Sequence, residues 1–167
     1  MQKSSYLYLF FLLFIGLSSC EQLVSADSEQ VDLDKEKDLI LTTLNNETKA
    51  AFQRDYQLWT QYWIHSEEIS KTYINFADSS FSESIGWKEI SGFVKEFIAT
   101  HPNPEPVPAL PDKIDVRLYE NGAWVSYQQL DAIRGLKREL RLMEKEDGQW
   151  KIAGMHTTIY GHSIEKR

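Results

Sequence analysis

Cysteine is almost absent from this chain, since Cys20 is the only one among 167 residues. A single cysteine excludes an internal disulfide and any cysteine-rich metal site. Histidine is also scarce, and His65, His101 and His162 show no metal-ligand spacing with one another or with a pair of carboxylates. We therefore predict neither a metal site nor a bound cofactor.

Basic residues are outnumbered, with 18 Lys and Arg against 25 Asp and Glu and a net charge of −7. An acidic domain repels phosphate backbones, so nucleic acid is not an expected partner. Long apolar runs are absent after the N-terminus, and the run from Tyr6 to Leu17 is shorter than the ~20 residues that a membrane-spanning helix needs. Residues 1–19 are therefore predicted to be an export signal peptide.

The end of this signal, Leu17-Ser18-Ser19-Cys20, resembles the lipobox of bacterial lipoproteins. The resemblance implies that Cys20 carries acyl chains such as palmitate and anchors the protein to a membrane of the bacterial cell envelope, with its domain outside the cytoplasm. Residues 20–31 are polar and lack periodicity, so we expect a lipidated cysteine and a tether there, followed by one domain over 32–162. An ordinary signal peptide with a stray cysteine is the alternative.

The hydrophobic content of 42% is enough for one domain with a sizeable core. Apolar or small residues recur at helical spacing in 34–52, and an aromatic group follows in a short second helix near 56–63. A third helix is predicted over 87–99. The residues that define the three helices are Ile40, Leu41, Leu44, Thr48 and Ala51, then Tyr56, Trp59, Tyr62 and Trp63, then Ile90, Phe93, Val94, Phe97 and Ile98.

Strands are predicted over 69–76, with Thr72, Ile74 and Phe76 on the more apolar face, and over 113–119 and 123–131. Residues 77–86 are rich in turn formers, and 101–112 holds all five prolines, so that segment is expected to be an extended loop. Asn121-Gly122 indicates a tight two-residue turn. That turn places Val125, Tyr127 and Gln129 inward and Trp124 outward.

The last segment, 139–160, is predicted to be a hairpin that turns at Glu146-Asp147-Gly148. A two-residue loop leaves Trp150 and Ile152 on the opposite face from Leu140 and Leu142. We prefer a three-residue loop with a glycine bulge, which gathers apolar and polar residues on one inward face. This face would hold Leu136, Arg138, Leu140, Leu142, Trp150, Ile152, Gly154, His156 and Thr158.

This order of elements, an α+β domain with a curved antiparallel sheet around N-terminal helices, resembles the nuclear-transport-factor-2-like superfamily in its SnoaL-like branch. The motifs that carry the resemblance are Trp59 with Tyr62, Gly86-Trp87-Lys88-Glu89-Ile90, Asn121-Gly122-Ala123-Trp124-Val125, and Asp147-Gly148-Gln149-Trp150-Lys151-Ile152 followed by His156. The resemblance implies a cystatin-like cone with an internal cavity. Its members include isomerases, dehydratases and pure binding modules, so fold alone does not fix the function.

Parity along the strands predicts a ligand pocket in the cone. Its lining is expected to be Trp59, Trp63, Val116, Tyr127, Gln129, Arg138, Leu140 and His156. We expect a small, partly apolar, anionic ligand, because a buried guanidinium at Arg138 needs a partner. The alternatives are an isomerase or dehydratase with His156 as acid or base, or a structural module. Catalysis is the less favoured reading, because no carboxylate is expected beside His156.

Homodimerisation is also predicted, through the convex face of the sheet. Trp124, Met143 and Met155 are expected to point outward on neighbouring strands. Apolar patches of this kind usually mark an interface. The alternative is that the long side chains of Glu139, Arg141 and Lys151 cover them.

Overall fold

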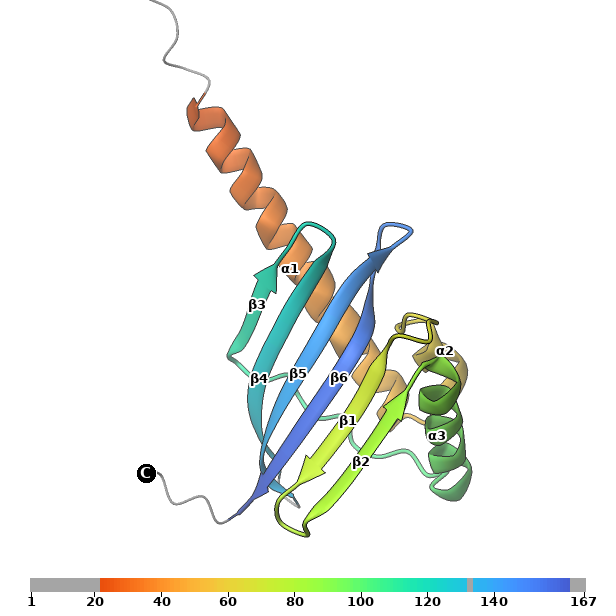
Figure 1. Ribbon diagram of the computed structural model, residues 1–167. Coiled ribbons are helices and arrows are strands. Elements are labelled where there is room, and N and C mark those ends of the chain that lie inside the picture. The colour runs from red at the N-terminus through yellow and green to blue at the C-terminus, as the bar shows by residue number, and fades with distance from the viewer. Residues whose placement is uncertain (1–21, 132–133, 163–167) are drawn as a thin grey trace, which may run out of the picture.

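The computed structural model describes residues 22–131 and 134–162, which form three helices and one six-stranded sheet (Figure 1). The fold is α+β with a curved, unclosed sheet, as predicted from the sequence. The strands lie in the order β2-β1-β6-β5-β4-β3, and every neighbouring pair is antiparallel except β1 and β6. The elements are α1 Gln22–Phe52, α2 Tyr56–Thr60, β1 Ser70–Asn75, β2 Ser80–Ile85, α3 Trp87–Thr100, β3 Ile114–Leu118, β4 Gly122–Asp131, β5 Gly135–Glu146 and β6 Gln149–Gly161.

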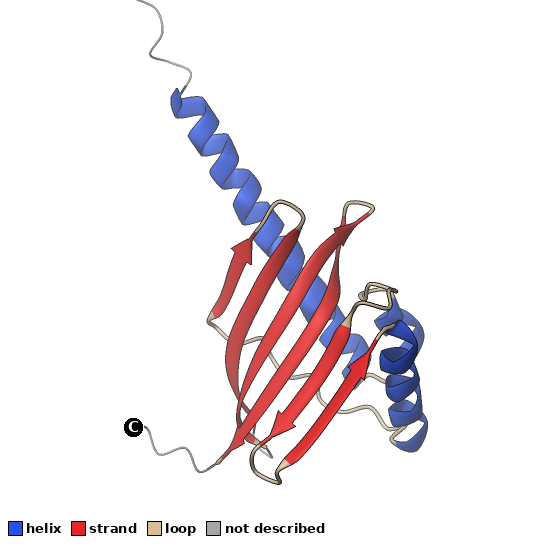
Figure 2. Cartoon of the chain, in the orientation of Figure 1, coloured by secondary structure: helices blue, strands red, loops and turns tan. Residues whose placement is uncertain are grey.

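All three helices stand on or beside one face of the sheet (Figure 2). Helix α1 crosses behind the strands and buries Ile40 and Leu44, as predicted, together with Ala50, whereas the predicted Leu41, Thr48 and Ala51 are only partly buried. It begins at Gln22, so residues 22–31, which we expected to be a non-periodic tether, are helical. None of the helices in the described ranges is both long enough and apolar enough to cross a membrane.

We call the face toward the helices the inner face and the opposite one the outer face. In β4, Ala123 and Val125 are fully buried while Trp124 is 41% exposed, so the odd-numbered residues point inward as expected. The turn itself differs, because Leu118 pairs with Ala123 rather than with Val125. The shift is by two residues, an even number, and therefore leaves every side chain on its predicted face.

The β5–β6 hairpin contradicts the predicted register. Glu146 pairs with Gln149 across a two-residue turn in which Asp147 and Gly148 both have positive φ. The register then slips between Leu142 and Met143, with Ala153 as the extra residue of a bulge. The two-residue turn puts the odd-numbered residues of β5 on the inner face together with Trp150 and Ile152, and the bulge brings Met155, Thr157 and Ile159 to the same face.

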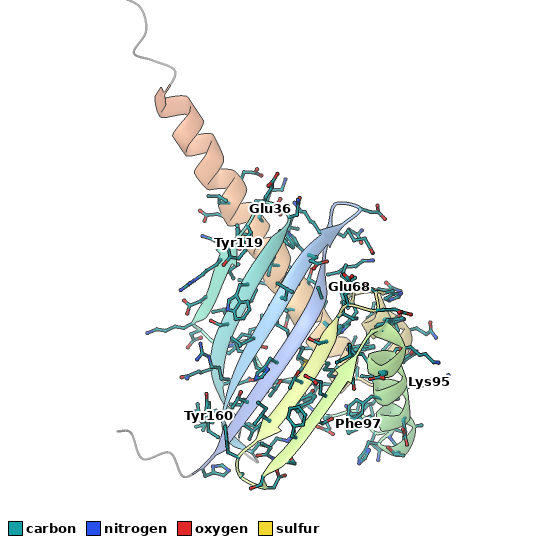
Figure 3. All side chains as sticks on the ribbon, viewed as in Figure 1. Glu36, Glu68, Lys95, Phe97, Tyr119 and Tyr160 are labelled. Carbon is teal, nitrogen blue, oxygen red and sulfur yellow. The ribbon has the colours of Figure 1, made fainter. Side chains whose placement is uncertain are left out.

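Strand β2 was missed in the sequence, because its serines resemble a turn. Five of its six residues are exposed, so it is an edge strand with little apolar signal. In β1, Lys71 and Tyr73 lie on the inner face, whereas Thr72 and Ile74, from the face predicted to be the more apolar one, lie on the outer face. Tyr119, in the β3–β4 loop, and Tyr160, near the end of β6, lie at opposite ends of the sheet along the direction of the strands (Figure 3).

Candidate functional site

Two neighbouring rows of side chains cross the middle of the inner face. Each row takes one residue from each of five adjacent strands, because directly paired residues share a face. Eight of these ten residues are polar, and we call the six that lie outside β2 the inner-face cluster: Lys71, Tyr73, Tyr127, Glu139, Arg141 and Thr157. The rows are Val125, Arg141, Met155, Lys71 and Ser84, and Tyr127, Glu139, Thr157, Tyr73 and Ser82.

Glu139 is the acidic centre of the cluster and is 3% exposed. Its Oε2 accepts hydrogen bonds from Arg141 Nη1 at 2.6 Å and from Thr157 Oγ1 at 2.7 Å, and its Oε1 lies 3.3 Å from Lys137 Nζ. Burial alone would raise the pKa of the Glu139 carboxyl, but Arg141, Lys137 and the Thr157 hydroxyl hold this pKa below its usual range. Glu139 therefore stays ionised at neutral pH.

Arg141 is 5% exposed, and its charge is only partly matched by the protein. Glu139 is its hydrogen-bonded carboxylate, but that carboxylate is shared with Lys137. The Arg141 Nε atom is buried and has no hydrogen-bond partner among the described residues. A buried donor without a partner costs about 1–3 kcal/mol, so the described residues satisfy this guanidinium only in part.

Lys71 is the second buried cation and is 8% exposed. Its Nζ atom lies 5.5 to 6.0 Å from the ring centroids of four aromatic residues, Trp59, Trp63, Tyr73 and Phe93. In the described part of the chain it has no carboxylate within ion-pair distance. Burial lowers the pKa of the Lys71 ammonium to about 8, and this effect outweighs the attraction of the nearby Glu47 carboxylate.

The two tyrosines of the cluster are neutral donors. Burial raises the pKa of Tyr73 and of Tyr127 to about 12, and the Glu139 charge adds to this effect in both. Both hydroxyls therefore keep their protons at physiological pH. Together with Arg141 and Lys71, they give the inner face several hydrogen-bond donors on adjacent strands.

Glu47 faces the cluster from α1 and is 6% exposed. Its Oε1 accepts hydrogen bonds from Trp59 Nε1 at 2.7 Å and from Trp63 Nε1 at 3.2 Å. These bonds fix the two indoles, whose ring centroids are 5.4 Å apart, beneath the Lys71 ammonium. Glu47 thus orients part of the aromatic surface on which the cluster rests.

The structure divides the predicted pocket lining between the two faces. Five residues lie on the helix side: Trp59 and Trp63 are buried, and Val116, Tyr127 and Gln129 point inward from the sheet. Gln129 donates a hydrogen bond to the Ala109 carbonyl oxygen at 3.1 Å. The other three lie on the outer face: the two-residue turn reverses the predicted orientation of Arg138 and Leu140 in β5, and the bulge at Ala153 reverses that of His156 in β6.

Sequence reasoning missed the residues that carry most of the charge, namely Glu47, Lys71, Glu139 and Arg141. Glu139 and Arg141 alternate with Arg138 and Leu140, so either face could have been the inner one until the register was known. Glu47 stands at helical spacing from Ile40 and Leu44, which was a readable signal that it faces the core.

The predicted dimer residues are also divided. Trp124 is exposed on the outer face, whereas Met143 is fully buried and Met155 is 9% exposed on the inner face. The two-residue turn accounts for the inward position of Met143 in β5, and the bulge at Ala153 accounts for that of Met155 in β6. Across 22–131 and 134–162, no three His, Cys, Asp or Glu residues are grouped so that they could hold a metal ion.

No protein-family model matches the sequence, and no curated protein matches it. Solved structures do match in fold. One is a nuclear-transport-factor-2-like protein of unknown function from Shewanella oneidensis, with 20% identity and a TM-score of 0.53 over 74% of this chain and 98% of that one. Another is a cystatin-like fold protein from Burkholderia xenovorans, with 17% identity and a TM-score of 0.57 over 74% and 93%.

A third similar structure is a candidate dehydratase of the nuclear-transport-factor-2-like family from Streptomyces avermitilis. It has 12% identity and a TM-score of 0.58, and the match covers 75% of this chain and 96% of that one. Identities this low establish a shared fold but not a shared activity. The chain therefore has the nuclear-transport-factor-2-like, cystatin-like cone fold.

Proposed function

We propose that this domain binds a small, partly apolar anion on the inner face of its sheet. The observation that carries the proposal is the buried Arg141 Nε atom, which has no hydrogen-bond partner among the described residues. An anionic oxygen is the acceptor that best satisfies a buried guanidinium. This inner-face site takes the place of the Arg138 and His156 pocket expected from the sequence.

The charge balance on the inner face supports an anionic ligand. Lys71, Lys137 and Arg141 face two carboxylates, Glu47 and Glu139, so one positive charge is in excess there although the whole chain is acidic. The Tyr73 and Tyr127 hydroxyls can donate further hydrogen bonds. Aromatic and aliphatic side chains surround these groups and suit an apolar ligand body, with Trp59, Trp63, Val125 and Met155 in the core.

Native mass spectrometry of the gently purified protein tests this proposal by looking for a retained small molecule. Arg141→Lys keeps the positive charge but removes the Nε donor, so we expect it to lose the retained mass. Arg138→Lys is the matched control, because Arg138 is on the exposed, outer side of the same strand. Equal retention by both variants contradicts an Arg141-centred site.

Titration of the intrinsic tryptophan fluorescence gives a second test that does not depend on copurification. Octanoate and benzoate are expected to change the emission, since Trp59 and Trp63 border the site, whereas octanol and benzyl alcohol lack the charge and are expected to bind at least tenfold more weakly. The same response to acids and alcohols contradicts an anion site.

We also propose that the protein is tethered to a bacterial cell-envelope membrane through lipidated Cys20. Support comes from the Leu17-Ser18-Ser19-Cys20 sequence after a short apolar run, which lies outside the described residues. Cys20→Ser is expected to release the protein from membranes or to leave it unprocessed. If this variant is still processed and still sediments with membranes, the anchor is not Cys20.

A second proposed property, homodimerisation, has support from the outer face. Large apolar side chains are exposed there on three strands, with Trp124 and Leu142 directly paired. The exposed set is Phe81, Ile85, Trp124, Leu130 and Leu142. We do not extend the proposal to catalysis by His156, since this residue lies on the outer face, away from the inner-face cluster.

A further inference from the structure

Lys71 has surroundings that the proposed anion site does not explain. Its side chain leaves β1 on the inner face and ends among four aromatic rings from α2, β1, α3 and the segment after α2. A lysine ammonium in water is strongly hydrated, and a surface lysine keeps that hydration. Lys71 is 8% exposed and pairs with no carboxylate in the described ranges, so it has lost most of its water without gaining an ion pair.

We propose that Lys71 is a reactive amine that forms a covalent imine with aldehydes or ketones that have an apolar body. The inference depends on Lys71 and its rings and does not require the anion site. Amines in apolar surroundings lose their proton more readily than amines in water, and the free amine is the nucleophile that attacks a carbonyl carbon. Here burial lowers the pKa of the ammonium to about 8, so a useful fraction is neutral near physiological pH.

The chemistry balances with the carbonyl compound as the sole co-reactant. The lone pair of Lys71 Nζ forms a bond to the carbonyl carbon, and the electrons of the C=O π bond move to oxygen. A proton passes from nitrogen to that oxygen to give a carbinolamine. The carbinolamine oxygen then takes up a proton from solvent, which replaces the proton that the Lys71 ammonium released when it became the free amine. The nitrogen lone pair forms the C=N bond as the C–O bond breaks, water leaves, and a protonated imine remains.

The aromatic surroundings favour this product. A protonated imine is still a cation at the position of Nζ, so it keeps the attraction of the ring faces that the ammonium had. The imine also has fewer hydrogen-bond donors to satisfy than the ammonium. The charged groups that face Lys71 are Glu47 from α1 and Glu139 and Arg141 from β5, with the neutral Tyr73 beside it on β1.

Reductive trapping on the full-length protein tests the proposal. The protein is treated briefly with limiting benzaldehyde and cyanoborohydride near neutral pH, and the benzylated lysines are quantified by peptide mass spectrometry. We expect Lys71 to be labelled at least tenfold faster than the exposed Lys95 and Lys113. Slower labelling of Lys71 than of these two means that it is merely buried and overturns the proposal.

Two controls test whether the fast labelling of Lys71 comes from the folded site rather than from the local sequence or from general accessibility. In urea, where the fold is lost, the rate advantage of Lys71 is expected to disappear; an advantage that survives unfolding contradicts a role for the rings. Lys71→Arg keeps a cation in the rings but cannot form an imine, so we expect the fast labelling phase to vanish while Lys95 and Lys113 react as before. A fast phase that persists in this variant assigns the reactive amine elsewhere.

Discussion

The burial of Lys71 can be tested by measuring how the stability of the protein depends on pH. Because its folded pKa, about 8, is below the unfolded value of about 10.4, the unfolded chain binds more protons between these limits. The free energy of unfolding should therefore rise with pH from about 8 toward 10, by at most ~1.4 kcal/mol per pH unit for this group. Above about pH 10 the raised pKa values of Tyr73 and Tyr127 act in the opposite direction.

Urea denaturation of the wild type and of Lys71→Met at several pH values measures this effect. The wild type should gain roughly 1–2 kcal/mol between about pH 8 and pH 9.5 relative to the variant, which has no group at this position to titrate. Parallel pH profiles for the two proteins contradict the lowered pKa.

Glu139 supplies the second prediction at the level of single residues. Glu139→Gln leaves the buried Arg141 without its ionised partner, and breaking a buried pair in this way typically costs about 3–5 kcal/mol. Glu144→Gln on the same strand is exposed and should change stability by less than about 0.5 kcal/mol. Chemical denaturation near neutral pH compares the two variants, and similar losses in both would remove the energetic role of the Glu139–Arg141 pair.

The sign of the acid response follows from the same contacts. The folded pKa of Glu139 is lowered, so its contribution is present above the unfolded pKa and is lost as the pH falls through the folded value. Wild-type protein should therefore lose more stability on acidification than Glu139→Gln does. An identical acid response in the two proteins argues that the carboxyl titrates normally.

At the level of elements, two glycines have nearly the same φ angle but different surroundings. Substituting each of them therefore separates the cost of a positive φ from the cost of a steric clash. Gly135 at the start of β5 has φ +78°, and Gly148 in the hairpin turn has φ +77°. A Cβ on Gly148 meets nothing within 4 Å, whereas one on Gly135 comes 2.2 Å from the Gly161 carbonyl carbon. Gly148→Ala should cost about 1 kcal/mol from the positive φ alone, and Gly135→Ala should cost clearly more. Thermal or urea unfolding of both variants measures the difference, and equal losses would mean that the β5–β6 contact relaxes freely.

The same hairpin shows what the sequence could and could not predict. Asp147-Gly148 and the flanking alternation predicted its existence and position correctly. The bulge at Ala153 could not be recognised, because alternation reports the period of a strand but not where one residue is skipped. By contrast, the error in the β3–β4 turn was an even shift, so Val125, Tyr127 and Gln129 were still assigned to the inner face.

The candidate site was harder to predict than the fold for a related reason. The apolar residues of α1 and α3 could be recognised, since Ile40, Leu44, Ile90 and Val94 recur at helical spacing and are buried. Buried charges break such patterns, and a search for apolar faces therefore assigns residues such as Lys71 to solvent. Glu139 pairs with Lys137 and Arg141 only in the folded structure, and this pairing offsets the cost of burying the three charges.

At the level of the whole molecule, α1 extends past the sheet toward the N-terminus (Figure 1). Its first residue, Gln22, follows closely on Cys20, the proposed anchor. A helix rises about 1.5 Å per residue, whereas an extended chain spans more than twice that, so a helical tether holds the domain nearer to its anchor and limits its reach. The sheet and its outer face would then stand at a set distance from the bilayer.

The outer face supplies the last prediction, which concerns the proposed homodimer. Leu142 is 42% exposed at the centre of this face and pairs with Trp124, so Leu142→Glu would place a charge in any interface formed there. Leu39→Glu on α1 is the matched control, because Leu39 is also 42% exposed but belongs to a helix on the other side of the sheet. Light scattering at tens of micromolar should give a dimer for the wild type and for Leu39→Glu, and a monomer for Leu142→Glu. A monomeric wild type contradicts the proposed dimer. Dissociation by Leu39→Glu but not by Leu142→Glu would mean that the interface is formed by α1 instead.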